Sequence, residues 1–511
     1  MRLNLEALPT DIPLLHKIIR EMVDSFSQEA LALREQLTSL KEQLTKLRAQ
    51  LHLSNARTYG VSSEKLERFE DVERLGDLEE FAKEDSESNE RTISKSQPKR
   101  QKLPDHLPRV EIIHDVNKCS SCGGDKLKKI SDDTYEILEY IKARFKVIKH
   151  VRPRCICTQC DHITQSYPVS YPIDKGIAGP GLLAHVMTQK YCYHLPLYRQ
   201  VKMYGTEGVE LSRSTMAGWM FYCGVVLMPL IQRLADYVLS STHIHGDDTP
   251  IKVLSPGLNK TKVGRIWTYV VDGRSYGGES RPAVCYRYSP DRKGSRPLEH
   301  LENFKGVLHA DAYAGYNGVY ERGGVTEAGC WAHTRRKFYE VTVVSDQAKV
   351  AYNALKSIQD LYGIEADVRG KSAEIRLEHR QKRSKEIVEK MFAQFERDLK
   401  DLPKKSGTAL AINYALNNKV ALYQFLEDGK IEIDNNIAER ALRGVAVGRK
   451  NWLFAGSDRG GHTAAAMFSL IESAKLNNLD PEKYLAHVLG VIQDYNAQKL
   501  DELLPWNIKI P

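Results

Sequence analysis

The sequence contains no run of about 18 apolar residues, the length that a membrane-spanning helix needs, so we expect no membrane segment. Its first residues, MRLNLEALPTDIPLLHKIIREM, lack an apolar stretch with a small-residue cleavage site, which argues against a signal peptide. Cysteine is scarce as well, with nine residues in 511, an odd number. We therefore expect a cytoplasmic protein with reduced thiols, some of them metal ligands, and no disulfide framework.

The rest of the composition is that of a globular protein, with 42% hydrophobic and 27% charged residues. The chain is too long for one hydrophobic core, and about three domains are expected. A formal net charge of +8 and a sequence pI near 8.8 are compatible with nucleic acid as a partner but do not establish it.

Residues 14–65 are predicted to form a leucine-zipper-like coiled-coil helix. Apolar residues recur there in steps of four and three: Ile19, Val23, Phe26, Ala30, Leu33, Leu37, Leu40, Leu44, Leu47 and Leu51. Helices bury such a stripe by supercoiling, which predicts a homo-oligomer; a helix packed on its own domain is the alternative. Residues 66–104 are too polar to bury much surface and are predicted to be a disordered charged linker, with a basic end that either contacts DNA or is solvated.

Two cysteine motifs predict a small zinc-binding domain at residues 105–170. They supply Cys119 and Cys122, then Cys157 and Cys160, and the β-branched and aromatic residues between the motifs predict a hairpin that joins them. Four thiolates match a tetrahedral site with no open position, hence a structural Zn²⁺. Cys155 is an alternative ligand to Cys157, and unligated core cysteines are the alternative to a zinc site.

Residues 171–240 are predicted to form a helical domain. Two helices joined by the turn at residues 205–208 fit a helix-turn-helix, with Ser212, Arg213 and Ser214 facing DNA. Ordinary helix packing fits the same spacing equally well, so the sequence leaves both interpretations open.

An α/β region follows, in two parts at residues 241–345 and 430–480. HIHGDDTPIKVL, RIWTYVVDG, AVCYRYS and KGVLHADAYAGYN are rich in strand-forming residues, whereas residues 346–429 have helical periodicity and are predicted to be a helical insertion. Residues 481–511 are expected to be a C-terminal tail.

Three carboxylates occur in an informative order: Asp247 in the first strand, Asp311 at the end of a later strand, and Glu439 in a helical segment. A ribonuclease H-like sheet brings three acids together in this order. Taken singly, each has a simpler interpretation, because a lone Asp at a strand end is usually a turn residue, and Asn436 with Glu439 has the spacing of a capping box. The combined order favours a shared site.

Such a site suits phosphodiester chemistry. Two divalent cations about 4 Å apart activate the attacking oxygen and stabilise the leaving one, and Mg²⁺ (or Mn²⁺) prefers carboxylate oxygens. Nearby basic residues are candidates for contacts with DNA phosphates, or else ordinary surface charges: Arg335, Arg336, Lys337, Arg440, Arg443, Arg449 and Lys450.

At these residues the chain resembles the Insertion Sequence 66 family of bacterial transposases over nearly its whole length. The matching stretches are GVSSEKLE, LPDHLPRVEIIHDV, KYCYHLPLYRQ, GDDTPIKVL, HADAYAGYN, CWAHTRRKF, IDNNIAERALRGVAVGRKNWLFAGSDRGG and SLIESAKLNNLDPEKYL. The resemblance implies a multidomain α/β protein: a coiled-coil helix, a zinc-binding domain, a helical domain and a ribonuclease H-like DDE core with a helical insertion. It carries the acidic triad onto Asp247, Asp311 and Glu439. The family usually has Asp-Glu-Thr where this chain has Asp247-Asp248-Thr249, which makes Asp248 a rival ligand.

The resemblance further implies a DNA transposase that binds insertion-sequence ends and target DNA, with Mg²⁺-dependent strand cleavage and strand transfer. It suggests accessory proteins from the same element. Cys330 and His333 resemble a Cys-x-x-His string of other transposases, which we expect to brace the site. The alternative function is a catalytically inactive, zinc-containing DNA-binding regulator.

Overall fold

The structure, a computed structural model, describes residues 145–148, 154–156, 163–165, 170–173, 176–255, 260–344 and 348–510. The predicted coiled coil, the charged linker and the side chains of the proposed zinc ligands (Cys119, Cys122, Cys157, Cys160 and the alternative Cys155) lie outside the described part. The chain divides into two compact units, residues 67–166 and the remainder. Within the smaller unit, β1 (Arg154–Ile156) pairs antiparallel with β2 (Ile163–Gln165).

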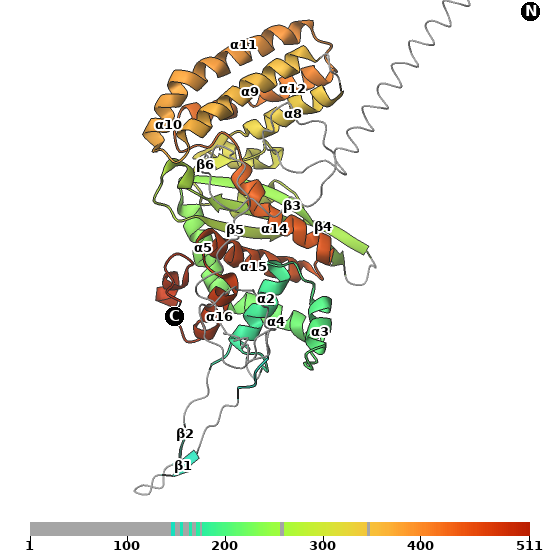
Figure 1. Cartoon of the computed structure of the whole chain (residues 1–511), viewed down its shortest axis with the longest axis vertical. Coiled ribbons are helices and arrows are strands. Elements are labelled where there is room, and N and C mark those ends of the chain that lie inside the picture. Colours follow the sequence, from blue (N-terminus) through green and yellow to red (C-terminus); the bar gives the residue numbers. More distant parts are fainter. Residues whose placement is uncertain are drawn as a thin grey trace, which may run out of the picture. The chain divides into compact units, whose positions relative to one another are not determined.

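A five-stranded mixed sheet lies at the centre of the larger unit (Figure 1). Its strands are β3 (His243–Ser255), β4 (Lys260–Val271), β5 (Ala283–Ser289), β6 (Gly306–His309) and β7 (Val325–Ala328). Their spatial order is β5-β4-β3-β6-β7: the first three are antiparallel neighbours, and β3, β6 and β7 run parallel. The predicted strand segments are therefore confirmed.

Helices cover both faces of this sheet. On one face, Tyr286 of β5 contacts Phe468 of α15 (Asp458–Leu476) and donates to the Ala441 carbonyl of α14 (Asn436–Trp452) at 2.6 Å. On the other face, Trp267 of β4 contacts Tyr316 of the short helix η3 (Ala314–Tyr316) edge to face. Side chains alternate between the two faces along a strand, and residues paired across neighbouring strands share a face. A residue of β3 therefore lies on the face of its partner in β4.

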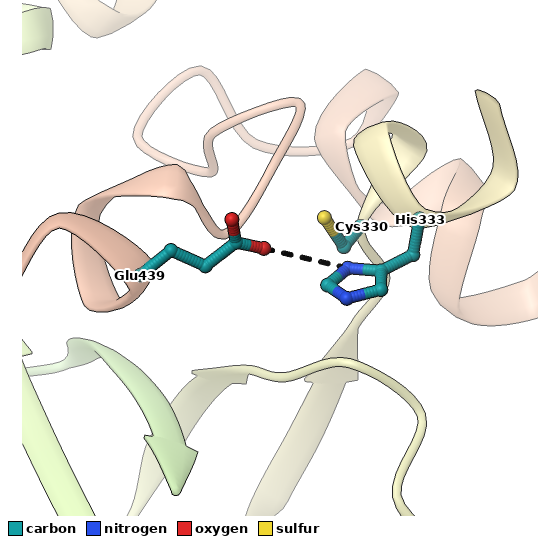
Figure 2. A group of neighbouring side chains, drawn as sticks. All are labelled: Cys330, His333 and Glu439. Atoms are coloured by element: carbon teal, nitrogen blue, oxygen red, sulfur yellow. Dashed lines mark ion pairs between the residues drawn. The ribbon is translucent and has the colours of Figure 1, made fainter. Parts of the chain in front are cut away.

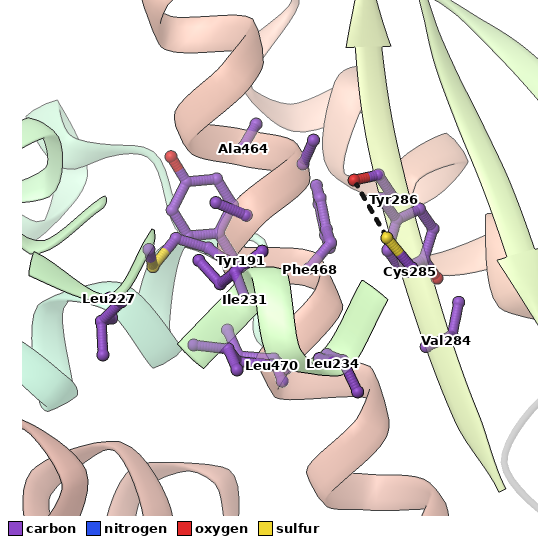
Figure 3. Packing of buried hydrophobic residues seen from close by; sticks show 14 of the residues in the cluster. Tyr191, Leu227, Ile231, Leu234, Val284, Cys285, Tyr286, Ala464, Phe468 and Leu470 are labelled. Atoms are coloured by element: carbon purple, nitrogen blue, oxygen red, sulfur yellow. Dashed lines mark hydrogen bonds between the residues drawn. The ribbon is translucent and has the colours of Figure 1, made fainter. Parts of the chain in front are cut away.

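Most of helix α15 is buried between the sheet and a layer of helices. The Phe468 ring lies between Tyr191 and Tyr286, with ring centroids 5.3 and 5.9 Å away (Figure 3). A Cβ on Gly461 would lie 2.5 Å from the Tyr288 ring, so only glycine permits this approach of helix to strand. The helix begins where Ser457 accepts a hydrogen bond from the Gly460 amide. Burying Phe468 contributes about 2–3 kcal/mol.

The layer on the outer side of α15 is helical, as predicted for residues 171–240. It contains α2 (Pro180–Tyr191), α3 (Leu197–Gly205), α4 (Arg213–Val226) and α5 (Met228–Ser240). α4 starts at the predicted Ser212, whose hydroxyl accepts from the Thr215 amide at 3.0 Å. The long helix expected from there is broken into α4 and α5, bent by 54° just before Pro229.

The expected C-terminal tail is folded. Residues 481–511 form α16 (Pro481–Val491) and η6 (Ala497–Leu503), and their buried side chains, including Tyr484 and Leu503, belong to the main core. Asp480 caps α16 by accepting from the Glu482 and Lys483 amides. Among the described helices, no single one is long and apolar enough to cross a membrane; the bent pair α4 and α5 meets the length and composition requirement together.

The helical insertion has its own core, built around Trp331, Phe338, Phe392 and Phe395 (Figure 1, upper part). Within the predicted bounds, residues 346–429, it contains α9 (Lys349–Val368), α10 (Ala373–His379), the π-helix η4 (Arg380–Ser384), α11 (Lys385–Asp401), α12 (Gly407–Asn417), α13 (Lys419–Tyr423) and η5 (Gln424–Leu426). The preceding helix α8 (Trp331–Val344), which the sequence assigned to the α/β region, packs into the same core through Trp331 and Phe338. Shorter elements elsewhere are η2 (Arg274–Tyr276), α6 (Ser295–His300) and α7 (Asn317–Glu321).

A buried ion network ties the insertion together and joins it to the segment before α14. The fully buried Arg380 donates to both oxygens of Glu365 at 2.7 Å and to the Phe425 carbonyl. Arg376, 2% exposed, pairs with Glu365 and, at 2.8 Å, with Glu432. Charges this deep are tolerated because each has a partner of opposite sign.

Candidate active site

Asp247 and Asp311 each follow one member of a matched pair of histidines on adjacent parallel strands. His245 of β3 lies opposite His309 of β6, and the two imidazole rings stack with centroids 4.3 Å apart. Each Asp lies two residues further along, and residues two apart on a strand share a face. The register therefore brings the two carboxylates to neighbouring positions, on the face of the sheet that α14 covers.

Asp247 is a buried carboxyl with acidic neighbours. Burial raises the pKa of Asp247 to about 8, and the charge of Asp311 is the next largest cause. Asp248 and Glu439 raise the pKa further, while the Asp248 amide, which donates to Asp247 Oδ1 at 2.7 Å, lowers it. Three further carboxylates therefore raise the pKa of Asp247, and the site carries an excess of negative charge.

The chain turns sharply directly after Asp311. Tyr313 N donates to Asp311 Oδ1 at 3.2 Å, and Ala312 has a φ of +60°, which is uncommon for a residue other than glycine. The Tyr414 hydroxyl of α12 approaches the Asp311 carbonyl at 3.5 Å. The second acid is therefore oriented by its own turn and lies beside the insertion.

Asn435 connects the start of α14 to both neighbouring elements. Its Nδ2 donates to the Gly246 carbonyl at 2.9 Å, and its Oδ1 accepts from His245 Nδ1 at 3.0 Å, since an amide oxygen can only accept. Its backbone amide donates to Cys330 Sγ at 3.3 Å. Asn435 is fully buried, and Glu439 follows it after one turn of helix, close enough to Asp247 for its charge to contribute to the raised pKa of that carboxyl.

The capping-box interpretation of this turn is wrong. α14 begins at Asn436, so the N-cap residue is Asn435, and its side chain makes no capping hydrogen bond. The Asn436 amide donates instead to Asp434 Oδ1 at 3.1 Å. The Asn435 side chain, which could have capped the helix, instead forms its hydrogen bonds with His245 and Gly246 of β3.

Cys330 and His333 lie against Glu439 (Figure 2). His333 Nδ1 is 3.7 Å from Glu439 Oε1, and ligand atoms of all three residues lie within 4.8 Å of one another. Burial lowers the pKa of His333 and raises the pKa of the Cys330 thiol, so both groups are neutral near pH 7. The geometry permits a metal ion at these three residues. The neutral Cys330 thiol also accepts a hydrogen bond from the Asn435 amide, which fits the bracing role expected from the sequence.

Asp248, the rival ligand, points to the opposite face of the sheet. It lies opposite Trp267 in the register, whereas Asp247 lies opposite Thr268. Its Oδ1 accepts two hydrogen bonds from Arg292, at 2.8 and 3.0 Å, and its Oδ2 pairs with Arg265 at 3.0 Å. Two guanidinium groups thus occupy this carboxylate away from the other acids.

The candidate phosphate contacts differ in exposure. Five are exposed: Arg336, Lys337, Arg440, Arg443 and Lys450. Arg335 and Arg449 are half-buried, and Arg335 lies over the Tyr339 ring. Arg449 Nη1 donates to Thr249 Oγ1 at 2.6 Å and to the Pro250 carbonyl at 2.7 Å, so it fastens the second half of α14 to β3.

Sequence reasoning missed the roles of Asn435, His245 and His309. A signal for the histidines was present, because the pattern His-x-Asp occurs twice, at His245 to Asp247 and at His309 to Asp311. The turn at Asp434-Asn435-Asn436 was recognised as polar, but the partners of Asn435 come from distant segments that no local pattern indicates.

Comparison with known families places these features in one class of protein. The family model described as "Transposase IS66 family" matches residues 175–463, more than half of the chain. Three more models match: "IS66 C-terminal element" at residues 469–506, "zinc-finger binding domain of transposase IS66" at 117–161, and "Transposase C of IS166 homeodomain" at 46–112. The chain therefore belongs to the IS66 transposase family, with a zinc finger that holds structural Zn²⁺ and DNA as its partner.

The chain is also similar to several bacterial proteins, two of them over most of their length and one over a short segment. "Uncharacterized protein y4hP" from Sinorhizobium fredii (strain NBRC 101917 / NGR234) is 38% identical over 438 residues, 83% of this chain and 79% of that protein. "Uncharacterized protein y4qI" from the same organism is 38% identical over 416 residues, 79% of this chain and 76% of that protein. "Uncharacterized protein YuaK" from Escherichia coli (strain K12) is 43% identical over 49 residues, 10% of this chain and 52% of that protein.

Proposed function

We propose that the protein is a DDE-type DNA transposase in which Asp247, Asp311 and Glu439 form the catalytic triad of a ribonuclease H-like core. One observation carries the proposal: two adjacent parallel strands and the first turns of a helix on the same face bring three acids together. The strand order also supports this core: β5, β4 and β3 are antiparallel neighbours, and β6 and β7 continue the sheet parallel to β3.

The residues fit magnesium. All three side chains offer hard oxygen ligands. Burial and then the charge of Asp311 raise the pKa of Asp247, and a bound divalent cation would offset both effects. Bound Mg²⁺ or Mn²⁺ would supply activation of the attacking oxygen and stabilisation of the leaving oxygen. The chain itself holds the acids in register, keeps Asp248 on the opposite face and orients Glu439 through Asn435 and His333.

The reaction has two phosphoryl transfers. In the first, water attacks a phosphodiester at the element end and the bond to the 3′ oxygen breaks, leaving a 3′ hydroxyl and a 5′ phosphate. In the second, that hydroxyl attacks a phosphodiester of target DNA, forming a new P–O bond and releasing a target 3′ hydroxyl. Exposed residues near the acids, among them Arg336, Lys337 and Arg443, bind flanking phosphates. The protein works on DNA in the cytoplasm, as an assembly joined through residues 14–65 and with accessory proteins of its element.

The test uses the purified full chain, Mg²⁺ and a duplex from the end of its own insertion sequence. Nicked and joined products are expected, and Asp311→Asn should lower the nicking rate on the order of 10³-fold because several kcal/mol of charge stabilisation is lost. The matched control is Asp291→Asn: Asp291 also lies two residues beyond its strand, β5, but it pairs with Arg296. Nicks without joining would indicate a nuclease, and binding without Mg²⁺-dependent products an inactive regulator.

A further inference from the structure

The loop between α14 and α15 presents two apolar side chains to solvent on strained backbone. Leu453 has a φ of +56° and a ψ of −42°, and Phe454 N donates to the Trp452 carbonyl at 2.6 Å. This is a γ-turn with positive φ at its centre, the rarer and more strained of the two γ-turn types. Leu453 is 61% exposed and Phe454 is 42% exposed, so the strain does not serve to bury them.

Rigid elements hold this loop on both sides. Ala455 N donates to the Lys252 carbonyl at 2.8 Å, and Ala455 O accepts from Leu254 N at 2.9 Å, which adds the loop to the end of β3. Before the turn, Arg449 fastens α14 to β3, and the Arg449 carbonyl accepts from Leu453 N at 3.1 Å. The two apolar side chains are therefore presented by a fixed scaffold.

The same side of α14 carries Glu439 and leads to this loop. Arg443 and Lys450 lie four and eleven residues beyond Glu439, close to one and three turns of helix, so they share its side of α14, and Leu453 follows directly after the helix ends at Trp452. Arg443 and Lys450 are exposed on α14. Lys252 of β3 is exposed as well, on the face of the sheet that carries Asp248. A path of positive charge thus runs from the acids to the apolar pair.

Charge decides which partner this surface fits. Lys262 and Arg459 line a hollow of about 470 Å³ beside the loop, together with Leu254, Ser255, Ser457 and Asp458. Lys262 pairs with Asp458 at 2.7 Å, and the surrounding exposed charges on α14 and β3 are positive. A second copy of this surface would be repelled by like charge, whereas the phosphates of DNA would be attracted.

Two independent measures give the distance from the acids to the loop. Along α14, 14 residues at about 1.5 Å each give roughly 21 Å. Along β3, six residues from Asp247 to Val253, which bridges to Ala455, give roughly 20 Å at about 3.3 Å each. At about 3.4 Å per base pair, this separation corresponds to about six base pairs.

We infer that Leu453 and Phe454 form an apolar wedge that enters a base step of double-stranded DNA, about six base pairs from the phosphate held at the acids. The inference rests on the proposed function and adds how the DNA is held. Apolar side chains that enter a base step unstack it and bend the duplex, while cations beside them neutralise its phosphates. The strained turn keeps the wedge exposed in the free protein, so no rearrangement is needed when DNA binds.

The test measures base unstacking in the full chain. Duplexes from the end of the protein's insertion sequence carry 2-aminopurine at single positions from two to ten base pairs from the cut. Fluorescence should rise at steps about six base pairs away and stay low elsewhere. Phe454→Ala and Leu453→Gly should abolish the rise and weaken binding about 10-fold, the effect of losing one side chain stacked on a base. Glycine at position 453 favours the positive φ, so this variant keeps the turn.

The control is Val420→Ala, which removes an apolar side chain that is 78% exposed on α13 of the insertion; it should leave fluorescence and affinity unchanged. If the wild type binds and nicks DNA but 2-aminopurine fluorescence rises at no position, the inferred wedge is wrong and the proposed function stands. If the wild type does not bind DNA, both are wrong. A change of sedimentation in the Leu453 and Phe454 variants, with fluorescence unaltered, would make the surface a protein interface and overturn the inference.

Discussion

At the scale of single residues, the burial of Asp247 beside other acids makes stability depend on pH. The pKa of Asp247 is about 8 in the folded chain, and its ordinary value is 3.8. Between these values the folded state binds more protons at this carboxyl than the unfolded state does, so the contribution of Asp247 to stability is fully present below pH 3.8 and is lost as pH rises toward 8. In magnesium-free buffer we expect a loss on the order of a few kcal/mol between pH 5 and pH 8.5.

Thermal melting at these two pH values measures this loss. Asp247→Asn cannot ionise and should flatten the pH dependence, whereas Asp291→Asn should leave it as in the wild type. Added Mg²⁺ should raise the melting temperature at pH 8.5, with about 2.7 kcal/mol gained at 100 times its dissociation constant. An unchanged slope in Asp247→Asn would show that this carboxyl is not the titrating group.

Asn435 is expected to act through Glu439 without touching DNA. Asn435→Ala leaves the Gly246 carbonyl and the His245 ring without partners, which should cost about 1–3 kcal/mol of folding free energy. Because the start of α14 loses its attachment to β3, the nicking rate at saturating DNA should fall while DNA affinity changes little. The matched control, Asn418→Ala, removes a side chain that bonds only the nearby Tyr414 carbonyl, and its nicking rate should stay normal. An equal loss of nicking rate in Asn435→Ala and Asn418→Ala would show that Asn435 has only a structural role.

At the scale of elements, the buried ion network should dominate the stability of the insertion. Glu365→Gln leaves two buried guanidinium groups, those of Arg376 and Arg380, without the charge that both face, and should destabilise the insertion by about 3–5 kcal/mol. Glu386→Gln removes an exposed partner of Lys390 and should change stability by less than about 1 kcal/mol. Urea unfolding of the full chain, followed by far-ultraviolet circular dichroism, distinguishes the two results. Similar small losses would mean that water reaches the network.

The elements also show what sequence reasoning can reach. The strands were predicted because their composition and alternation are local, and Asp247, Asp311 and Glu439 were singled out because each stands beside such a local pattern. The break between α4 and α5 was missed although Pro229 marks it, because the apolar pattern continues through the bend. The capping role assigned to Asn436 failed because a tertiary partner, Gly246, binds the neighbouring Asn435 instead. Long-range partners of this kind leave no trace in local spacing.

At the scale of the whole molecule, the zinc finger and the larger unit should unfold separately. The chain divides into two compact units, so loss of zinc should leave the melting transition of the larger unit in place. Replacing Cys119 and Cys122 by serine should lower bound zinc from about one ion per chain to none and weaken DNA binding. The control Cys192→Ser replaces a half-buried free cysteine of the larger unit, and this variant should bind as much zinc as the wild type. A common shift of all transitions in the zinc-free variant would show that the units are coupled.

The late position of α14 and α15 in the chain has a consequence for synthesis. A ribosome makes the zinc finger, β3 and β6 first, but the third acid and the helix that fills one face of the sheet emerge only after the whole insertion. Under the proposed function, nascent chains would therefore contain the zinc finger well before they contain all three acids needed to cut DNA. Messages that are broken or terminated early would yield products that occupy the element ends without cleaving them, and so restrain the full-length enzyme.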